Sequence, residues 1–274
     1  MTFLAEVTAG AIFIPIGILG GLAVVFAILL AILGKKLAVV RDERIDQVAK
    51  LLSGANCGGC GQAGCDAFAC ALVEGKAKIN DCNATPKENK DKIADILGVA
   101  NDGEETAVVV ACCGGVNSKD KYEYQGYGDC RTLELLAGGS KQCTSACLGK
   151  ATCVDNCPNY AIEVGMNGYA EINQDKCTAC GVCLSNCPKS VIKRIPASAK
   201  VYVACNNHEK GKAVREVCSN GCIACGMCQR NCTQGAITMV DNLPVIDYKK
   251  CTGCKVCVEK CPVKCIHEFA RGNK

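Results

Sequence analysis

Hydrophobic and polar residues are unevenly distributed along this chain, and its longest apolar stretch lies near the start. No residue from Val7 to Gly34 is charged, and this stretch contains the run AIFIPIGILGGLAVVFAILLAIL. A helix rises ~1.5 Å per residue, so a run of this length can cross a hydrocarbon core of about 30 Å. We therefore expect an N-terminal transmembrane helix that anchors the chain.

The charges that flank this run distinguish an anchor from a cleaved signal peptide. A signal peptide carries positive charge before its apolar segment. Here Lys35, Lys36, Arg41 and Arg44 follow the run, and no basic residue precedes it. Basic residues next to a membrane span stay in the cytoplasm. The pattern predicts a single-pass protein whose C-terminal bulk is cytoplasmic.

Beyond the anchor, the apolar pattern predicts short elements. Residues 36–52 and 89–97 carry apolar side chains at near-helical spacing, and DAFACALVEG fits a third helix. TAVVVA, residues 106–111, and KVYVA, residues 200–204, are rich in β-branched residues and fit strands. Each strand is followed by a cysteine, a loop and a second cysteine, which predicts two related halves from Thr106 onward.

The cysteine content changes this picture. Of the 274 residues, 27 are cysteine, whereas aromatic residues make up 4% and tryptophan is absent. Few large side chains are available for a core, so disulfides or metal clusters must stabilise the fold. The odd cysteine count and the repeated CxxCxxC segments favour metal ligation in a reducing compartment.

Charge and motifs exclude other classes of function. A net charge of +4 gives no indication of nucleic-acid binding. The sequence has no phosphate-binding loop, no GxGxxG after a strand and no Ser/His/Asp arrangement, so the chain is not expected to bind a flavin or nicotinamide itself.

The most regular cysteine run is DKCTACGVCLSNCPKS, in which Cys177, Cys180, Cys183 and Cys187 precede Pro188. This spacing and the Cys-Pro ending are typical of bacterial ferredoxins that bind [4Fe–4S] clusters. The fourth cysteine of such a run ligates the neighbouring cluster, so one run implies a second. Zinc is the alternative, but zinc sites need neither the third close cysteine nor the Cys-Pro ending.

Three further runs and one separate motif bring the count to five clusters. The runs begin at Cys143, Cys222 and Cys251, with hairpins expected after the first two at residues 161–176 and 236–250. The separate motif is NCGGCGQAGC, with a fourth cysteine further on. With ligands crossing between paired runs, the expected sets are Cys57, Cys60, Cys65 and Cys82; Cys143, Cys147, Cys153 and Cys187; Cys177, Cys180, Cys183 and Cys157; Cys222, Cys225, Cys228 and Cys261; and Cys251, Cys254, Cys257 and Cys232.

A sixth cluster between the two halves is expected from the remaining cysteines. Its candidate ligands are Cys112, Cys130, Cys205 and Cys218. Cys112 is preferred to Cys113 because Cys112 directly follows its strand, as Cys205 does. The alternative is that these are isolated structural thiols. Cys70 and Cys265 are expected to be packing residues and not ligands.

Lysines gather around the last cysteine runs, at Lys249, Lys250, Lys255, Lys260 and Lys264. Such a group forms either a solvated face or a docking surface for an acidic electron carrier.

The order of these segments resembles the B subunit of the Rnf electron-transport complex, an ion-translocating ferredoxin:NAD⁺ oxidoreductase. The resemblance covers essentially the whole chain and rests on NCGGCGQAGCDAFA, CCGG, YQGYGDC, CLGKATCVDNCPNYAI, VCSNGCIACGMC and KCTGCKVCVEKCP. The chain departs from the family pattern at Cys70 and in NATP after Cys82, where a Pro-Gly turn is usual.

The resemblance implies a complex of the bacterial inner (plasma) membrane that oxidises reduced ferredoxin, reduces NAD⁺ at another subunit and pumps sodium ions or protons. This chain then relays electrons through [4Fe–4S] clusters to membrane and flavin-bearing partners, and none of its residues is catalytic. We expect electrons to arrive at the C-terminal ferredoxin module and to leave from the Cys57–Cys82 cluster. Alternatives are an electron-input subunit of a hydrogenase or regulator-reducing system, a zinc-stapled scaffold and a carrier for cluster assembly.

The expected fold class is α+β, with two tandem bacterial-type ferredoxin modules flanked by short strands. The expected domains are a transmembrane anchor (1–36), a four-cysteine iron–sulfur domain (37–100), a strand and cysteine unit (101–142), a first ferredoxin module (143–199), a second strand and cysteine unit (200–220) and a second ferredoxin module (221–274).

Overall fold

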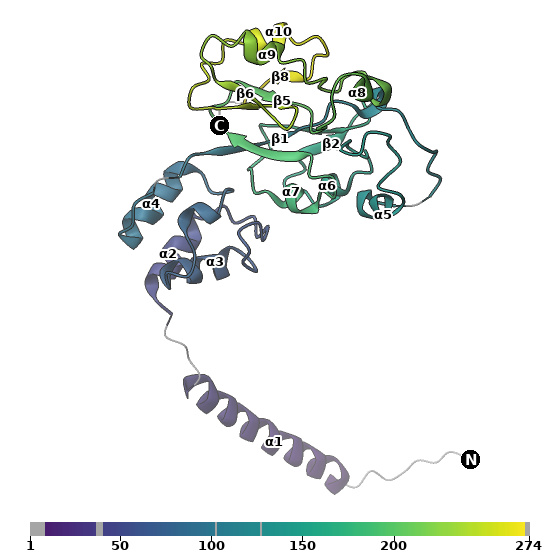
Figure 1. The fold of residues 1–274 in the computed structure, drawn as a ribbon. Helices are drawn as coiled ribbons and strands as arrows, with labels where there is room; N and C mark the ends of the chain where they lie inside the picture. The colour runs from purple at the N-terminus through teal and green to yellow at the C-terminus, as the bar shows by residue number, and fades with distance from the viewer. Residues whose placement is uncertain (1–8, 37–40, 102, 127, 272–274) are drawn as a thin grey trace, which may run out of the picture. The chain divides into compact units, whose positions relative to one another are not determined.

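The computed structural model describes residues 9–36, 41–101, 103–126 and 128–271. The chain divides into two compact units, residues 1–43 and 44–274, which we describe separately. Figure 1 shows the long helix of the first unit in purple and the strands of the second unit in teal to yellow. The elements give the mixed α+β class expected from the sequence.

The first unit contains α1 (Ala9–Lys36), the apolar helix expected near the N-terminus. Its segment Gly17–Gly34 has a mean hydropathy of 2.6 and is exposed along its whole length. Among the described residues, it is the one helix long and apolar enough to cross a membrane. Such a helix needs an apolar environment or a partner, because exposed apolar surface is unfavourable in water.

The second unit begins with a small helical domain. Its helices are α2 (Glu43–Leu51), α3 (Cys65–Val73), the 3₁₀ helix η1 (Ile79–Asp81) and α4 (Lys87–Leu97). Val48, Phe68 and Ile93 are almost fully buried in its core. The helices expected at DAFACALVEG and at 89–97 are confirmed. The helix expected over 36–52 is shorter, because α2 begins at Glu43, and residues 37–40 lie outside the described residues.

The rest of the second unit consists of two halves. The first contains β1 (Thr106–Val110), η2 (Gly115–Asn117), α5 (Cys130–Leu135), α6 (Thr152–Asp155), β2 (Ile162–Val164), β3 (Ala170–Ile172), α7 (Val182–Asn186) and β4 (Ile192–Pro196). The second contains β5 (Val201–Val203), α8 (Lys212–Val217), α9 (Met227–Arg230), β6 (Ile237–Val240), β7 (Leu243–Ile246), α10 (Val256–Glu259) and β8 (Ile266–Glu268).

Both halves pair their strands in the same way. The inner strands form the antiparallel hairpins expected between cysteine runs, β2 with β3 and β6 with β7. The first strand of each half pairs antiparallel with its last strand, β1 with β4 and β5 with β8. This repeated topology confirms the two related halves.

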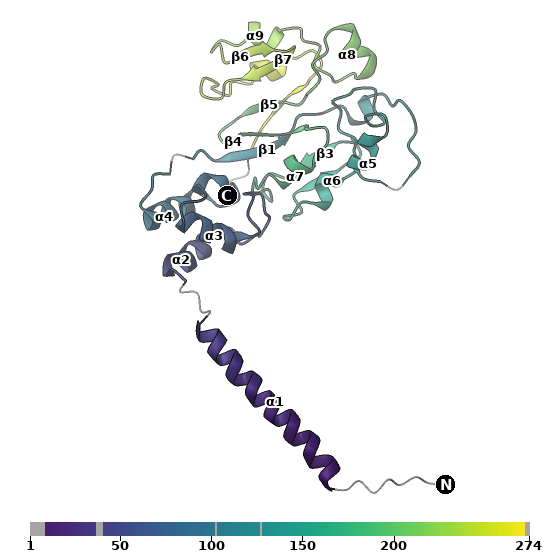
Figure 2. The ribbon, with the colours of Figure 1, turned by 60° about the horizontal axis from the view of Figure 1, so that its bottom comes forward.

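The sheet of β1 and β4 joins the two halves, because both of its faces are buried. Alternate residues of a strand point to opposite faces. Val108 and Val110 pack with cysteines of the first half, whereas Ala107 and Val109 pack in a cluster with Phe269 near the C-terminus. Figures 1 and 2 both show this sheet between α7 and β5. Burial on both faces explains why TAVVV is a continuous apolar run without alternation.

Candidate iron–sulfur centres

All 27 cysteines carry free thiols. Five cavities in the second unit are each lined by at least four of them. Among residues 9–36, 41–101, 103–126 and 128–271, no three His, Cys, Asp or Glu side chains converge closely enough to hold one metal ion. A zinc ion needs its thiolates at ~2.3 Å from one point, whereas a [4Fe–4S] cluster holds them around a larger body. The thiols therefore fit clusters better than zinc.

One cavity brings together the four expected cysteines of the helical domain, which we call site 1: Cys57, Cys60, Cys65 and Cys82. Gly59 permits a close approach to the next domain, since a Cβ there would lie 2.4 Å from the carbonyl oxygen of Cys180. Asn56 closes the loop, because its Oδ1 accepts a hydrogen bond of 2.8 Å from the backbone N–H of Cys65.

A second cavity holds the crossed set expected in the first ferredoxin module, site 2: Cys157, Cys177, Cys180 and Cys183. The loop turns through left-handed backbone at Ala179 (φ 57°) and Gly181 (φ 88°) before α7 begins. The backbone N–H of Ala179 donates to Sγ of Cys177, and that of Ala161 donates to Sγ of Cys157, each at 3.4 Å. The turns thus wrap the chain around the cavity with N–H donors directed at sulfur.

The third cavity differs from the sequence expectation. It is lined by the set that we call site 3: Cys130, Cys147, Cys153 and Cys187. Cys130 lies where Cys143 was expected, and Cys143 lies in the cavity between the halves instead. The same 24 cysteines remain candidate ligands, but two of them exchange places.

Local hydrogen bonds explain the position of Cys130. The carboxylate of Asp129 caps α5 by accepting a 2.8 Å hydrogen bond from the N–H of Thr132. The N–H of Cys130 donates to Oγ1 of Thr152 at 2.7 Å, directly before Cys153. These contacts hold the start of α5 against α6, so the thiol of Cys130 reaches the cavity beside Cys153.

The interval between Cys143 and Cys147 is the sequence signal that separates them. Three residues lie between them, whereas a ferredoxin loop has two. The N–H of Gln142 donates to the carbonyl oxygen of Lys119 at 2.8 Å, which holds Cys143 next to the segment that leads out of the Cys112 strand.

Site 4 lies between the halves and contains Cys112, Cys143, Cys205 and Cys218. Cys113 also lines this cavity, but its thiol donates a hydrogen bond to the carbonyl oxygen of Asn220, with 3.7 Å between Sγ and oxygen. A ligating cysteine is a thiolate and has no proton to donate. Cys112 therefore fits as the ligand better than Cys113.

The second ferredoxin module carries the last two sets. Site 5 contains Cys222, Cys225, Cys228 and Cys261, which line one cavity as expected. Cys265 lines the same cavity, with its Sγ 3.7 Å from that of Cys261. The set expected at site 6 is Cys232, Cys251, Cys254 and Cys257, carried by the segments around α9 and α10, two helices that contact each other.

Burial raises the pKa of several of these thiols, and neighbouring thiols add to the effect. The pKa reaches about 12 at Cys153 and Cys183. At site 5, hydrogen bonds from the buried thiol of Cys265 lower the pKa of Cys261 and of Cys222. Thiols whose pKa is raised keep their protons at neutral pH, so metal binding at such a site releases protons.

Direct contacts connect the first three sites. Site 1 meets site 2 where Gly59 abuts the carbonyl oxygen of Cys180. Site 2 and site 3 share the first ferredoxin module, where α6 contacts α7. The thiol of Cys183 in site 2 is close enough to Cys153 in site 3 for Cys153 to help raise its pKa. Sites 1, 2 and 3 are therefore successive neighbours.

Two hydrogen bonds connect site 4 to the sites on either side. The backbone N–H of Cys147 in site 3 donates to Sγ of Cys112 in site 4 at 3.3 Å. The backbone N–H of Cys222 in site 5 donates to Sγ of Cys205 in site 4, also at 3.3 Å. Site 4 thus lies between site 3 in the first half and site 5 in the second.

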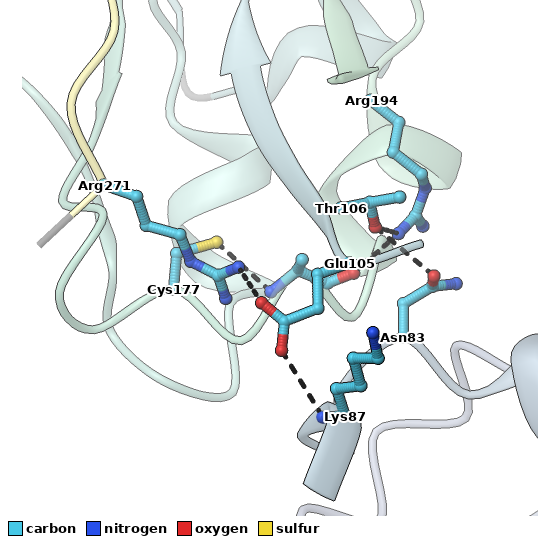
Figure 3. Close-up of polar contacts among 8 residues, drawn as sticks. Asn83, Lys87, Glu105, Thr106, Cys177, Arg194 and Arg271 are labelled. Atoms are coloured by element: carbon cyan, nitrogen blue, oxygen red, sulfur yellow. Dashed lines mark hydrogen bonds and ion pairs between the residues drawn. The ribbon is translucent and has the colours of Figure 1, made fainter. Parts of the chain in front are cut away.

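Polar side chains connect the surroundings of site 1 to the loop of site 2 (Figure 3). The guanidinium group of Arg194 donates to the carbonyl oxygen of Ala179 at 2.8 Å and to Oγ1 of Thr106 at 3.2 Å. The hydroxyl of Thr106 donates to Oδ1 of Asn83, the residue after Cys82, at 3.3 Å. The start of β1 and the middle of β4 therefore join the helical domain to the ferredoxin module.

Glu105 extends this network. Its carboxylate accepts a hydrogen bond from the N–H of Lys87 at the start of α4 and lies 3.5 Å from the guanidinium of Arg271. A residue near the C-terminus thus also contacts the junction between site 1 and site 2. Outside the six sites, Cys70 lies on α3 and packs against the core of the helical domain.

Comparison with known proteins gives family matches in three parts of the chain. A model for an Fe-S cluster domain matches residues 52–84, a 4Fe-4S binding domain matches 170–193, and a 4Fe-4S dicluster domain matches 221–265. The first range contains the whole of site 1, and the third contains all cysteines expected at sites 5 and 6.

The chain is also similar to curated proteins over most of its length. It is 43% identical over 258 residues, covering 93% of this chain and 78% of the relative, to the B subunit of the Na(+)-translocating ferredoxin:NAD(+) oxidoreductase complex of Acetobacterium woodii. It is 40% identical over 253 residues, 92% of this chain and 96% of the relative, to the B subunit of the ion-translocating oxidoreductase complex of Methanosarcina acetivorans. The B subunit of the proton-translocating ferredoxin:NAD(+) oxidoreductase complex of Clostridium ljungdahlii is 38% identical over 257 residues, 92% of this chain and 90% of the relative.

Proposed function

This chain belongs to the family of B subunits of ion-translocating ferredoxin:NAD⁺ oxidoreductase complexes, the Rnf complexes, and we propose that its six cysteine sites form a single electron path. It is an electron-transfer subunit of such a complex and carries several [4Fe–4S] clusters. Because the chain belongs to this family, we no longer consider it an electron-input subunit of a hydrogenase.

Each of the six sites holds one cluster through four cysteine thiolates. When bound, [4Fe–4S] clusters supply one-electron transfer. The chain contributes thiolates that fix each cluster, backbone N–H groups that donate to sulfur, and apolar walls such as Val191 and Ile192 at site 3 that exclude water. In this proposal the chain relays electrons, and NAD⁺ reduction takes place at another subunit.

The observation that carries this proposal is the pair of N–H···S hydrogen bonds on the two sides of site 4. Each joins the backbone of one candidate ligand, Cys147 or Cys222, to the sulfur of a candidate ligand in site 4. A cluster at site 4 would lie between the clusters of sites 3 and 5. Electrons could then pass from one ferredoxin module to the other in two short steps. The order from the C-terminal end is then site 6, 5, 4, 3, 2 and 1.

Electrons arrive at site 6 in this proposal. Cys254 is an exposed cysteine, and the five lysines of this region, Lys249, Lys250, Lys255, Lys260 and Lys264, are exposed as well. Complementary charge speeds the encounter of two proteins. The donor that fits this surface is reduced ferredoxin with an acidic face.

Electrons leave from site 1 toward membrane and flavin-bearing subunits. The domain of site 1 directly follows α1 in the chain, so a membrane anchor keeps it near the bilayer. In this proposal α1 spans the bacterial inner membrane once, and the basic residues after it keep the C-terminal bulk in the cytoplasm.

The test replaces Cys251 and Cys254 with Ala in the assembled complex. Ferredoxin is then expected to lose its ability to reduce the remaining clusters, while a chemical reductant still reduces them and membrane insertion is unchanged. Cys70→Ala is the matched control and keeps ferredoxin-dependent reduction. Undiminished reduction by ferredoxin in the double variant would place the arrival site elsewhere.

The lysines supply a second readout of the same proposal. Reversing Lys249 and Lys250 to Glu is expected to slow reduction by ferredoxin and to weaken its dependence on salt concentration. The same reversal at the exposed Lys76, in the helical domain, should leave both unchanged. Equal rates and equal salt dependence in all three proteins would contradict docking at this surface.

A further inference from the structure

Two ligating sulfurs, at different sites, lie within hydrogen-bond distance of a side chain that is not itself a ligand. At site 1, Oγ1 of Thr85 lies 3.2 Å from Sγ of Cys82. At site 5, Sγ of Cys265 lies 3.7 Å from Sγ of Cys261. Thr85 and Cys265 are 4% and 1% exposed, so water does not compete with either contact.

The chemistry of the ligand fixes the direction of each hydrogen bond. A cysteine that binds iron is a thiolate and has no proton to give. The hydroxyl of Thr85 must therefore donate to Cys82. The thiol of Cys265 must donate its one proton to the ligands of site 5, where it is shared between Cys261 and Cys222. Buried hydrogen bonds to an ionised acceptor are stronger than those between neutral groups.

The thiol of Cys265 is a second hydrogen-bond donor to its site. The corresponding positions after other cysteine runs supply only a backbone N–H donor. The residues four positions after the other Cys-Pro or Cys-Thr cysteines are Ala161, Val191 and Ala236. The backbone N–H groups of Ala161 and Ala236 donate to Sγ of Cys157 and Cys232, at 3.4 and 3.3 Å. At Cys265 the corresponding backbone also contacts Cys261, and the side chain contributes a thiol in addition.

Thr85 occupies the segment NATP, one of the places where the chain departs from the usual family pattern. This segment follows Cys82 directly, and the burial of Thr85 directs its hydroxyl at the ligand instead of at solvent. Sites 1 and 5 thus each receive a side-chain donor from a different kind of residue in an unrelated loop.

We propose that Thr85 and Cys265 raise the reduction potentials of the clusters at sites 1 and 5. The proposal rests on the proposed function, in which these sites hold clusters. A reduced cluster carries one more negative charge than an oxidised one, so a hydrogen bond to its ligand stabilises the reduced state more. Sites 5 and 1 follow sites 6 and 2 in the direction from Cys254 to Cys57. Raised potentials at these two positions therefore favour the transfers from site 6 to site 5 and from site 2 to site 1, and reduce the driving force for the step that leaves each site.

The test measures the midpoint potential of each cluster in the anaerobically purified full chain, by redox titration followed with electron paramagnetic resonance. Cys265→Ala introduces the residue found at Ala161 and Ala236, and Thr85→Val removes the hydroxyl while nearly keeping the shape. Each variant is expected to lower one potential, with a three- to tenfold change in the reduction equilibrium; a tenfold change is about 59 mV for one electron. Iron content should stay at the wild-type value.

Two conservative variants keep the proposal testable if the first pair folds poorly. Cys265→Ser and Thr85→Ser retain a donor and are expected to keep potentials close to wild type, and Cys70→Ala should change none. Full iron content with unchanged potentials in Cys265→Ala and Thr85→Val would overturn the role of these donors. Loss of about four irons in Cys265→Ala would instead make Cys265 a ligand and would equally overturn it. Wild-type protein without iron at sites 1 and 5 would contradict the proposed function itself.

Discussion

The guanidinium group of Arg194 donates a 2.8 Å hydrogen bond to the carbonyl oxygen of Ala179, in the middle of the site 2 loop. Because Arg194 also contacts Thr106, which bonds to Asn83 beside site 1, this side chain fixes the loop of one site relative to the next. The relative position of sites 1 and 2 therefore depends on residues that belong to neither set of cysteines.

Arg194→Ala is expected to loosen this junction. It leaves the Ala179 carbonyl without its charged donor, and a loss of this kind costs about 1–3 kcal/mol of stability. Arg194→Lys keeps the charge but cannot bond to Ala179 and Thr106 with one planar group, so it should fall between the wild type and the Ala variant. Thermal unfolding measures the stability, and spin coupling between the clusters of sites 1 and 2 measures their separation. Unchanged coupling in Arg194→Ala would contradict the positioning role.

The regrouping of Cys130 and Cys143 is tested by counting iron in double variants. A double variant that loses two ligands of the same site loses one cluster. A double variant that loses one ligand from each of two sites loses two clusters. We expect Cys130→Ala with Cys153→Ala to lose about four irons, and Cys143→Ala with Cys153→Ala to lose about eight. The grouping expected from spacing alone gives the opposite result for the two pairs, so the comparison decides between them.

Cys112 and Cys113 are neighbours with different expected roles. Cys112→Ala should remove about four irons, because Cys112 faces the ligands of site 4. Cys113→Ala should keep full iron content and lose only packing and the weak hydrogen bond to Asn220. Iron analysis of the two variants side by side gives the answer, and the reverse pattern would exchange their roles.

Gly59→Ala probes the contact between sites 1 and 2. The added Cβ would lie 2.4 Å from the carbonyl oxygen of Cys180, which is a backbone atom that cannot rotate away. Overpacking of this kind costs about 1–3 kcal/mol, so a lower melting temperature is expected. The electron paramagnetic resonance signals of the clusters at sites 1 and 2 should also change. Gly165→Ala is the control, because nothing lies within 4 Å of its Cβ position. Equal melting temperatures for the two variants would show that the loop yields without cost.

The regular cysteine runs could be assigned from the sequence because one tight loop fixes their ligands. Cys177, Cys180 and Cys183 share a cavity with Cys157 as their spacing predicted. The apolar helix and the strand and hairpin positions also followed from local pattern.

The position of Cys130 could not be predicted in the same way. It depends on a capped helix and a hydrogen bond to Thr152, which lies 22 residues away in the chain. The side-chain donors Thr85 and Cys265 were missed for a related reason. A threonine or a spare cysteine near a ligand acquires its role only when burial turns it toward sulfur.

In the proposed electron path, six four-cysteine sites in this chain each hold a [4Fe–4S] cluster. Anaerobic purification of the full chain followed by iron and acid-labile sulfide analysis tests it most directly. Six sites with four irons each predict about 24 irons and about 24 sulfides per chain. About 20 irons and about 20 sulfides would mean that one of the six sites holds no cluster. Zinc without sulfide would contradict cluster binding at all six sites.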